Sequence, residues 1–145
     1  MQSTIEPRRL LAACAAFLVP PRCVLCDAPG MNAPGRAGPL DLCADCLAGL
    51  PRTAAGDAFQ SRAFSHICCP WRFEFPVDEL VRALKFHGER TYARVLGTLL
   101  ARERMELAAD AEAAPLPGLI VPVPLHPLRL RERGYNQAAE LARFA

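Results

Sequence analysis

Four cysteines in two C-x-x-C pairs are the residues of this chain whose types and spacing most clearly indicate chemistry. The pairs are Cys23-Val-Leu-Cys26 and Cys43-Ala-Asp-Cys46, and sixteen residues separate them. Two C-x-x-C turns complete a tetrahedral shell of thiolates around one ion, at roughly 2.3 Å. A closed shell leaves no position for a catalytic water, so the spacing predicts a structural zinc ion. Disulfide bonds or redox-active dithiols are the alternative.

A basic segment near the end of the sequence is the second candidate site. If this segment is an extended loop, Arg129, Arg131 and Arg133 project to one side of it. Gly134 would let the backbone approach a ligand, and Asn136 would cap the helix that follows. Three guanidinium groups beside a helix N-terminus predict a phosphate-binding site. A solvated arginine stretch with ordinary helix capping is the alternative.

The length and overall charge of the chain limit its architecture and its ligands. A chain of 145 residues has room for a small metal module joined to one modest core. Lys and Arg number 17 against 15 Asp and Glu, a net charge of +2, which excludes the broad basic field of a histone-like protein. Only Lys85 is a lysine, so cationic clusters depend on arginine, which suits bidentate phosphate contacts.

Three further cysteines and an apolar N-terminal run bear on the location of the protein. Cys14, Cys68 and Cys69 lie outside the two pairs, and free thiols favour a reducing cytoplasm. Residues 10–19 are small or apolar and follow two arginines, in the outline of a secretory signal peptide. That run is shorter than the roughly 20 residues that cross a bilayer. We therefore expect a cytoplasmic protein with no membrane span, and secretion is the alternative.

Changes in composition divide the chain into four segments. We expect an N-terminal helix in 1–21, a metal module in 22–50, a linker in 51–63, and a further domain in 64–145. Within the metal module, a loop rich in Gly and Pro connects the two cysteine pairs, and a short helix is expected around Cys46 to Leu50.

Two amphipathic helices are the clearest elements of the last segment. Val77, Leu80, Val81 and Leu84 follow the i, i+3, i+4, i+7 pattern of one helix face, and Gly88 is placed to end that helix. A second helix is expected from about residue 91. Its expected apolar face consists of Tyr92, Val95, Leu96, Leu99, Leu100 and Leu107.

Extended segments flank these helices. Residues 64–75 are rich in aromatic and apolar side chains and predict an edge strand or hairpin. Residues 119–126 predict a buried strand, whose two prolines leave one edge able to pair. A basic loop over 127–135 and a helix from Asn136 would follow. Helices alternating with a strand predict an α/β fold, and because one strand cannot form a sheet we expect an incomplete domain.

Several motifs together give the chain a family resemblance. They are Pro20-Pro21-Arg22-Cys23-Val-Leu-Cys26, Leu42-Cys43-Ala-Asp-Cys46, Leu84-Lys85-Phe86-His87-Gly88, Val121-Pro-Val-Pro-Leu-His126 and Arg133-Gly134-Tyr135-Asn136-Gln137-Ala138. With these motifs the chain resembles the ComF family of competence-associated, phosphoribosyltransferase-like proteins. The resemblance implies an N-terminal zinc-ribbon-like module followed by an incomplete type I phosphoribosyltransferase-like domain.

The resemblance also implies a role in the uptake of transforming DNA in bacteria. The chain would be a binding or adaptor factor for single-stranded DNA or a phosphorylated small molecule, with a competence helicase or recombination proteins as partners. The alternative is the front half of a phosphoribosyltransferase that uses phosphoribosyl pyrophosphate. Its phosphoribosyl-pyrophosphate loop would lie beyond Ala145, so the chain by itself is expected to be inactive, and Mg²⁺ is expected only in a full-length enzyme.

Overall fold

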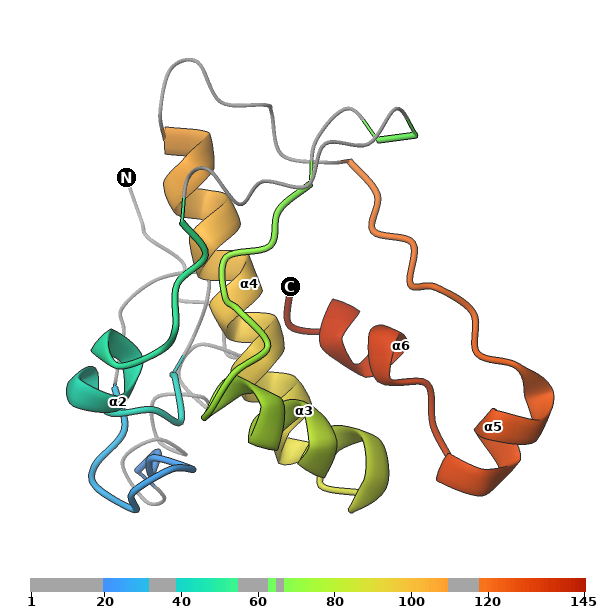
Figure 1. Cartoon of the computed structure of the whole chain (residues 1–145), viewed down its shortest axis with the longest axis horizontal. Helices are drawn as coiled ribbons and strands as arrows, with labels where there is room; N and C mark the ends of the chain where they lie inside the picture. Colours follow the sequence, from blue (N-terminus) through green and yellow to red (C-terminus); the bar gives the residue numbers. More distant parts are fainter. Residues whose placement is uncertain (1–19, 32–38, 55–62, 65–66, 110–117) are drawn as a thin grey trace, which may run out of the picture. The chain divides into compact units, whose positions relative to one another are not determined.

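A computed structural model of the chain describes residues 20–31, 39–54, 63–64, 67–109 and 118–145. Within these ranges the ordered elements are helices and isolated β-bridges (Figure 1). The chain divides into two compact units, Met1–Ala48 and Gly49–Ala145. Residues 1–19, which hold Cys14 and most of the expected N-terminal helix, lie outside the described residues.

Backbone pairings between short loops organise the first unit. Met31 pairs with Leu40 in an isolated antiparallel bridge, and Leu42 also accepts a hydrogen bond from the Met31 N–H at 3.0 Å. Leu40 and Leu42 are both fully buried. Helix α2 spans Ala44–Ala48, so it begins two residues before the expected helix and ends before Leu50. The Cys43 sulfur explains this start, because it accepts the Cys46 N–H at 3.4 Å.

Helix α3, Val77–Phe86, confirms the first amphipathic prediction. Val77, Leu80 and Leu84 are buried, which places the predicted face against the protein. Gly88 follows the helix with a φ of +71°, a backbone conformation that glycine adopts without a steric penalty. The helix therefore ends where its sequence predicted.

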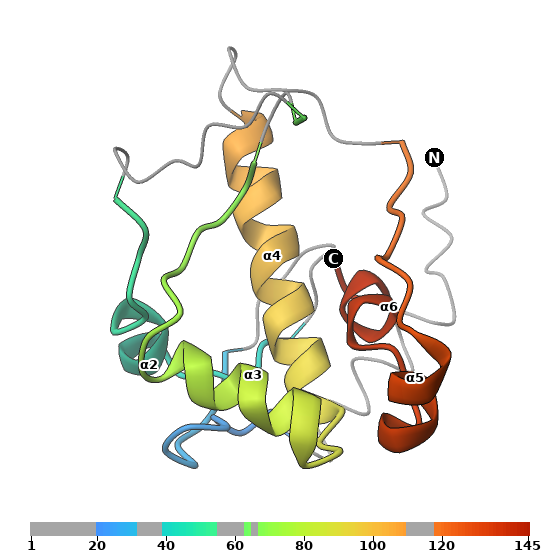
Figure 2. The ribbon, with the colours of Figure 1, turned by 45° about the vertical axis from the view of Figure 1, so that its right-hand side comes forward.

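Helix α4, Thr91–Ala109, packs against α3 and against α6, Gln137–Ala142 (Figure 1, Figure 2). Because α4 has two helical neighbours, its residues 95–99 are all buried and the buried surface is wider than the single predicted stripe. Gly97 sets the distance to α6. A Cβ atom there would lie 2.6 Å from the Leu141 carbonyl oxygen and 2.8 Å from Phe144 Cβ.

The prediction of a buried strand over residues 119–126 is wrong. The segment is extended but has no strand partner among the described residues, and Leu119, Val121 and Val123 are 73–76% exposed. Prolines at 122 and 124 remove two of the N–H groups that a sheet would need. Within the expected extended segment 64–75, the only described pairing is an isolated bridge between Trp71 and Arg52.

The basic segment is also not the loop that we expected. Residues Pro127–Arg133 form helix α5. Pro127 stands in its first turn, and the His126 Nδ1 accepts the Leu128 N–H at 3.3 Å. Gly134 then adopts a φ of +77° and donates its N–H to the Leu130 carbonyl at 2.8 Å. These capping interactions at both ends favour a helix over an extended loop.

Candidate functional site

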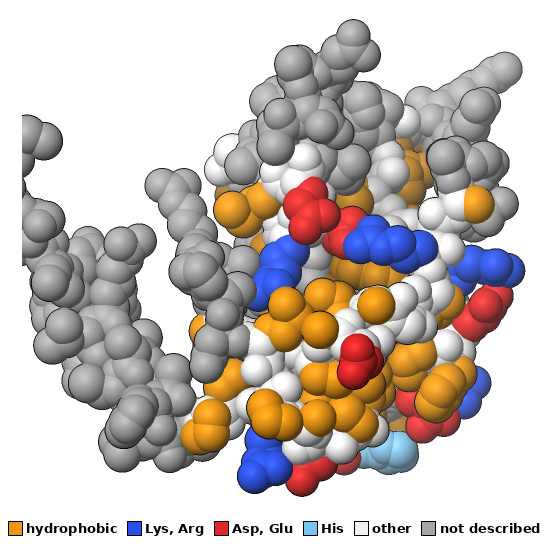
Figure 3. All heavy atoms as spheres, turned by 90° about the vertical axis from the view of Figure 1, so that its left-hand side faces the viewer, with side chains coloured by type: hydrophobic (Ala, Val, Ile, Leu, Met, Phe, Trp, Pro, Cys, Tyr) orange, Lys and Arg blue, Asp and Glu red, His pale blue; other side chains and the backbone are white. Residues whose placement is uncertain are grey.

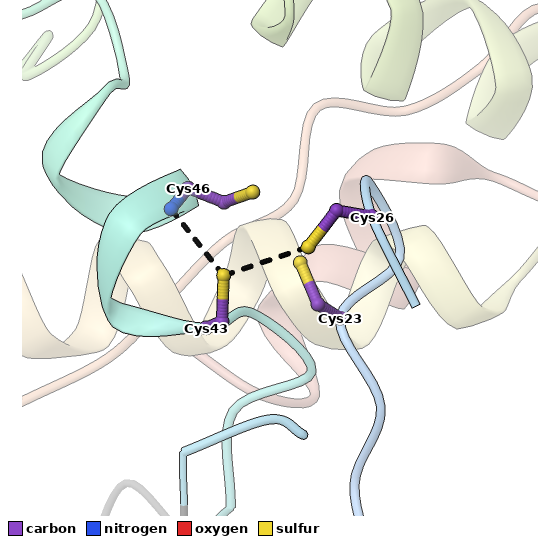
Figure 4. Close-up of side chains that lie close together, drawn as sticks. All are labelled: Cys23, Cys26, Cys43 and Cys46. Carbon is purple, nitrogen blue, oxygen red and sulfur yellow. Dashed lines mark hydrogen bonds between the residues drawn. The ribbon is translucent and has the colours of Figure 1, made fainter. Parts of the chain in front are cut away.

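The four paired cysteines converge at one point in the first unit (Figure 4). All four sulfur atoms lie within 4.8 Å of one another, and the Cys26 and Cys43 sulfurs are 3.6 Å apart. A tetrahedral shell of thiolates around a zinc ion has sulfurs about 3.8 Å apart. The separation of Cys26 and Cys43 is close to that value and far longer than the roughly 2.05 Å of a disulfide. The cluster could therefore hold a metal ion.

Two local turns position these sulfurs. The first pair lies on a turn in which Asp27 donates its N–H to the Cys23 carbonyl at 2.8 Å. Asp27 completes that turn with a φ of 60°, which an aspartate tolerates better than most residues. The second pair straddles the start of α2, with Cys43 before the helix and Cys46 in its first turn. Both turns are held by hydrogen bonds between residues three or four apart. For this reason the C-x-x-C spacing was sufficient to predict them.

The cluster is also electrostatically suited to a cation. Burial by itself raises the pKa of the Cys23 thiol, but hydrogen bonds from the backbone at Cys43, Leu25 and Cys26 outweigh burial and lower that pKa to about 6. The pKa of Cys46 is raised, first of all by its hydrogen bond with the Cys43 side chain. Like charges so close together resist joint ionisation. A bound cation would remove that repulsion, since metal binding requires the deprotonated ligands.

The predicted phosphate residues do not assemble as the loop interpretation required. Residues four apart share one face of a helix, whereas residues two apart lie about 200° apart around it. In α5, Arg129 and Arg133 therefore lie on one face and Arg131 on another. The expectation that all three project to one side is wrong. Phosphate binding by these residues stays a prediction.

Asn136 caps helix α6, as predicted. Its Oδ1 accepts the N–H groups of Ala138 at 2.9 Å and Ala139 at 3.4 Å. Its Nδ2 donates to the Val123 carbonyl at 2.9 Å. Asn136 thereby occupies two of the N–H groups that a phosphate at this helix end would use.

A pocket of about 430 Å³ in the second unit brings Lys85 of α3 together with two arginines of α5. It is lined by residues 85–88 at the end of α3, by Arg129, Glu132 and Arg133 of α5, and by Tyr135. Sequence analysis assigned Arg129 and Arg133 to a site but missed the contribution of Lys85 and His87. The available signal in the sequence was that the single lysine, Lys85, is followed within three residues by His87 and Gly88.

Contacts in and beside this pocket connect the region of α3 with the end of α5 and with Tyr135. The buried Tyr135 hydroxyl donates a hydrogen bond to the Leu84 carbonyl. The Arg133 guanidinium lies over the Phe86 ring, 5.1 Å from its centroid, and Arg90 lies 5.4 Å from the centroid of the Tyr135 ring. Cation–π contacts of this kind hold arginine side chains in place without neutralising their charge.

Comparisons with protein-family models, with curated proteins and with solved structures find no match to this chain. Among the described residues, no helix is long and apolar enough to cross a membrane.

Proposed function

We propose that this chain is a ComF-like binding factor, in which a structural zinc ion holds the first unit and the second unit binds phosphate. The observation that carries the proposal is the convergence of four cysteine sulfurs within 4.8 Å. Cys23, Cys26, Cys43 and Cys46 would be the ligands. Thiolates select zinc over harder cations such as Mg²⁺ and Ca²⁺.

A structural role for the ion is supported by the composition of the first unit. Its buried apolar residues among those described are Pro21, Cys23, Leu40 and Leu42, so one of the four is itself a proposed ligand. Such a small core contributes little stability on its own. Four thiolates also fill a tetrahedral shell and leave no open position for substrate.

The phosphate-binding part of the proposal is supported by the pocket between α3 and α5. Lys85, Arg129 and Arg133 line it together with a single carboxylate, Glu132. The second unit would be the incomplete phosphoribosyltransferase-like domain, and the role in DNA uptake follows from the family resemblance. In this proposal the chain acts by binding, as an adaptor for single-stranded DNA in the cytoplasm.

Metal analysis of the purified protein tests the zinc site. We expect about one zinc ion per chain, and a loss of most of it in Cys43→Ser because three thiolates bind zinc more weakly than four. Cys68→Ser is the matched control, because Cys68 is an exposed free thiol outside the cluster, and it should keep the metal. A metal-free protein that is nonetheless folded, with disulfides among the four cysteines, would contradict the proposal.

A further inference from the structure

Two cations of the α3–α5 pocket have no carboxylate partner among the described residues. Most described arginines form ion pairs. The paired arginines are Arg22, Arg52, Arg72, Arg82, Arg90, Arg129 and Arg143. Lys85 and Arg133 form no such pair in the described part of the chain, although both line the same pocket.

The charge in this pocket matches a doubly charged anion. Lys85, Arg129 and Arg133 contribute three positive charges and Glu132 one negative charge, so the pocket carries a net charge of +2 before any contribution from His87. The carboxylate of Glu132 already pairs with Arg129 at 3.3 Å. A phosphate monoester carries up to two negative charges near neutral pH, whereas a phosphodiester carries one. A terminal phosphate therefore complements the pocket better than an internal one.

The pocket also offers an aromatic surface beside its charges. Phe86 is 65% exposed although it lines the pocket and has the Arg133 guanidinium 5.1 Å from its ring centroid. Stacking of a base on an aromatic ring contributes about 1–3 kcal/mol at single-strand binding sites. The volume of about 430 Å³ lies within the range that holds a small organic ligand and exceeds what a phosphate alone would fill.

We infer that this pocket binds the 5′-terminal phosphate of single-stranded DNA, with Lys85 and Arg133 on the phosphate and Phe86 under the terminal base. This inference rests on the proposed phosphate-binding function and specifies its ligand as the end of a strand. On the face seen in Figure 3, positive and negative side chains lie interspersed among hydrophobic ones.

Fluorescence anisotropy with a short oligothymidylate labelled at its 3′ end tests the inference directly. The oligonucleotide is prepared with a 5′-phosphate and with a 5′-hydroxyl, and both are titrated with the full chain at low salt. We expect the phosphorylated strand to bind about tenfold more tightly, since charge-assisted hydrogen bonds to phosphate are strong. The preference should shrink as salt rises.

Two variants locate the preference within the molecule. Lys85→Met should abolish most of the difference between the two oligonucleotides. Arg82→Gln is the matched control, because Arg82 belongs to the same helix α3 as Lys85 but does not line the pocket, and it should keep the difference. Both residues are exposed, so neither substitution should prevent folding, and a circular dichroism melt checks this. Loss of the preference in Arg82→Gln alone would overturn the assignment to the pocket.

The remaining outcomes distinguish recognition of a 5′-terminal phosphate from the proposed binding of single-stranded DNA in general. Equal binding of the two oligonucleotides by the unmodified chain would overturn the inference and leave single-strand binding intact. Failure to bind either one at low salt would overturn both proposals. Thymidine 5′-monophosphate serves as the competitor. If it displaces the labelled strand at a concentration equal to the dissociation constant of the strand, the ligand is a free phosphate monoester and the strand assignment is wrong.

Discussion

The unit that contains the four cysteines and the helical unit after it differ in what orders their side chains. In the first unit the described buried apolar residues are few, and Cys23, a proposed metal ligand, is one of them. In the second unit, α3, α4 and α6 pack against one another through apolar side chains such as Leu84 and Val95. In our proposal, coordination of a metal ion would stabilise the first unit, whereas hydrophobic burial stabilises the second. Removal of a metal ion should therefore affect mainly the first unit, and a change in helix packing should affect mainly the second.

Removal of the metal is the strongest test of this difference. A structural zinc site contributes about 10–16 kcal/mol of apparent binding free energy in small peptides, far more than the first unit can recover from its few buried residues. We expect a chelator to unfold the first unit. Hydrogen exchange should show lost protection at the Met31 and Leu40 amides, which are paired in the structure. The amides of α4 should stay protected, and their simultaneous loss would contradict the separation of the two forces.

Substitution of Gly97 by alanine should affect the helical unit by an intermediate amount. The added Cβ would lie 2.6 Å from the Leu141 carbonyl oxygen, so α4 and α6 must move apart. We expect Gly97→Ala to lower the free energy of unfolding by about 1–3 kcal/mol, although alanine favours helices more than glycine does by about 1 kcal/mol. Urea denaturation measures this change.

Gly118→Ala is the matched control for that substitution. A Cβ atom at Gly118 would meet no atom within 4 Å, so its effect should stay within about 0.5 kcal/mol. If Gly97→Ala stabilised the protein instead, helix propensity would outweigh packing. That result would contradict the close contact between α4 and α6 at Gly97.

Protonation of Glu140 should give the smallest effect. A hydrogen bond from Arg90, at 2.5 Å, is the main cause that lowers the pKa of Glu140 below its ordinary value of 4.5. A lowered pKa means that this stabilisation is complete above the ordinary value and is lost as the pH falls further. Glu140→Gln should therefore reduce the free energy of unfolding by roughly 0.5–1 kcal/mol at about pH 7.

The pH dependence distinguishes this ion pair from a general packing role. As the pH falls below 4.5 and through the lowered pKa of Glu140, the wild-type carboxylate takes up a proton, so the unfolding free energies of Glu140→Gln and of the wild type should converge. Thermal or urea unfolding at a series of pH values from neutral into acid measures the difference. A deficit of the variant that persists unchanged in acid would show that Glu140 acts through packing and not through its charge.

Features that depend on neighbouring residues were predictable from the sequence. The C-x-x-C spacing places two sulfurs on one turn, the apolar period of α3 selects Val77, Leu80 and Leu84 for burial, and Asn136 caps α6 through N–H groups two and three residues away. Helix α5 also has local signals, with Pro127 in its first turn and Gly134 at its end. The spacing of the arginines favours an extended loop instead, and the capping interactions at both ends of α5 outweigh it.

The exposure of residues 119–126 and the composition of the α3–α5 pocket could not be predicted from the sequence, because both depend on the tertiary structure. Apolar composition predicts that residues 119–126 are buried, but burial requires a neighbouring strand, and the described residues provide none. Lys85 and Arg133 are distant in sequence, and they meet in one pocket because Tyr135 bonds to the Leu84 carbonyl. By itself the sequence determined the two cysteine turns and the main helices, whose interactions span a few residues. Only the tertiary structure decided that Arg129 and Arg133 share a pocket with Lys85, because that depends on how α3 and α5 pack.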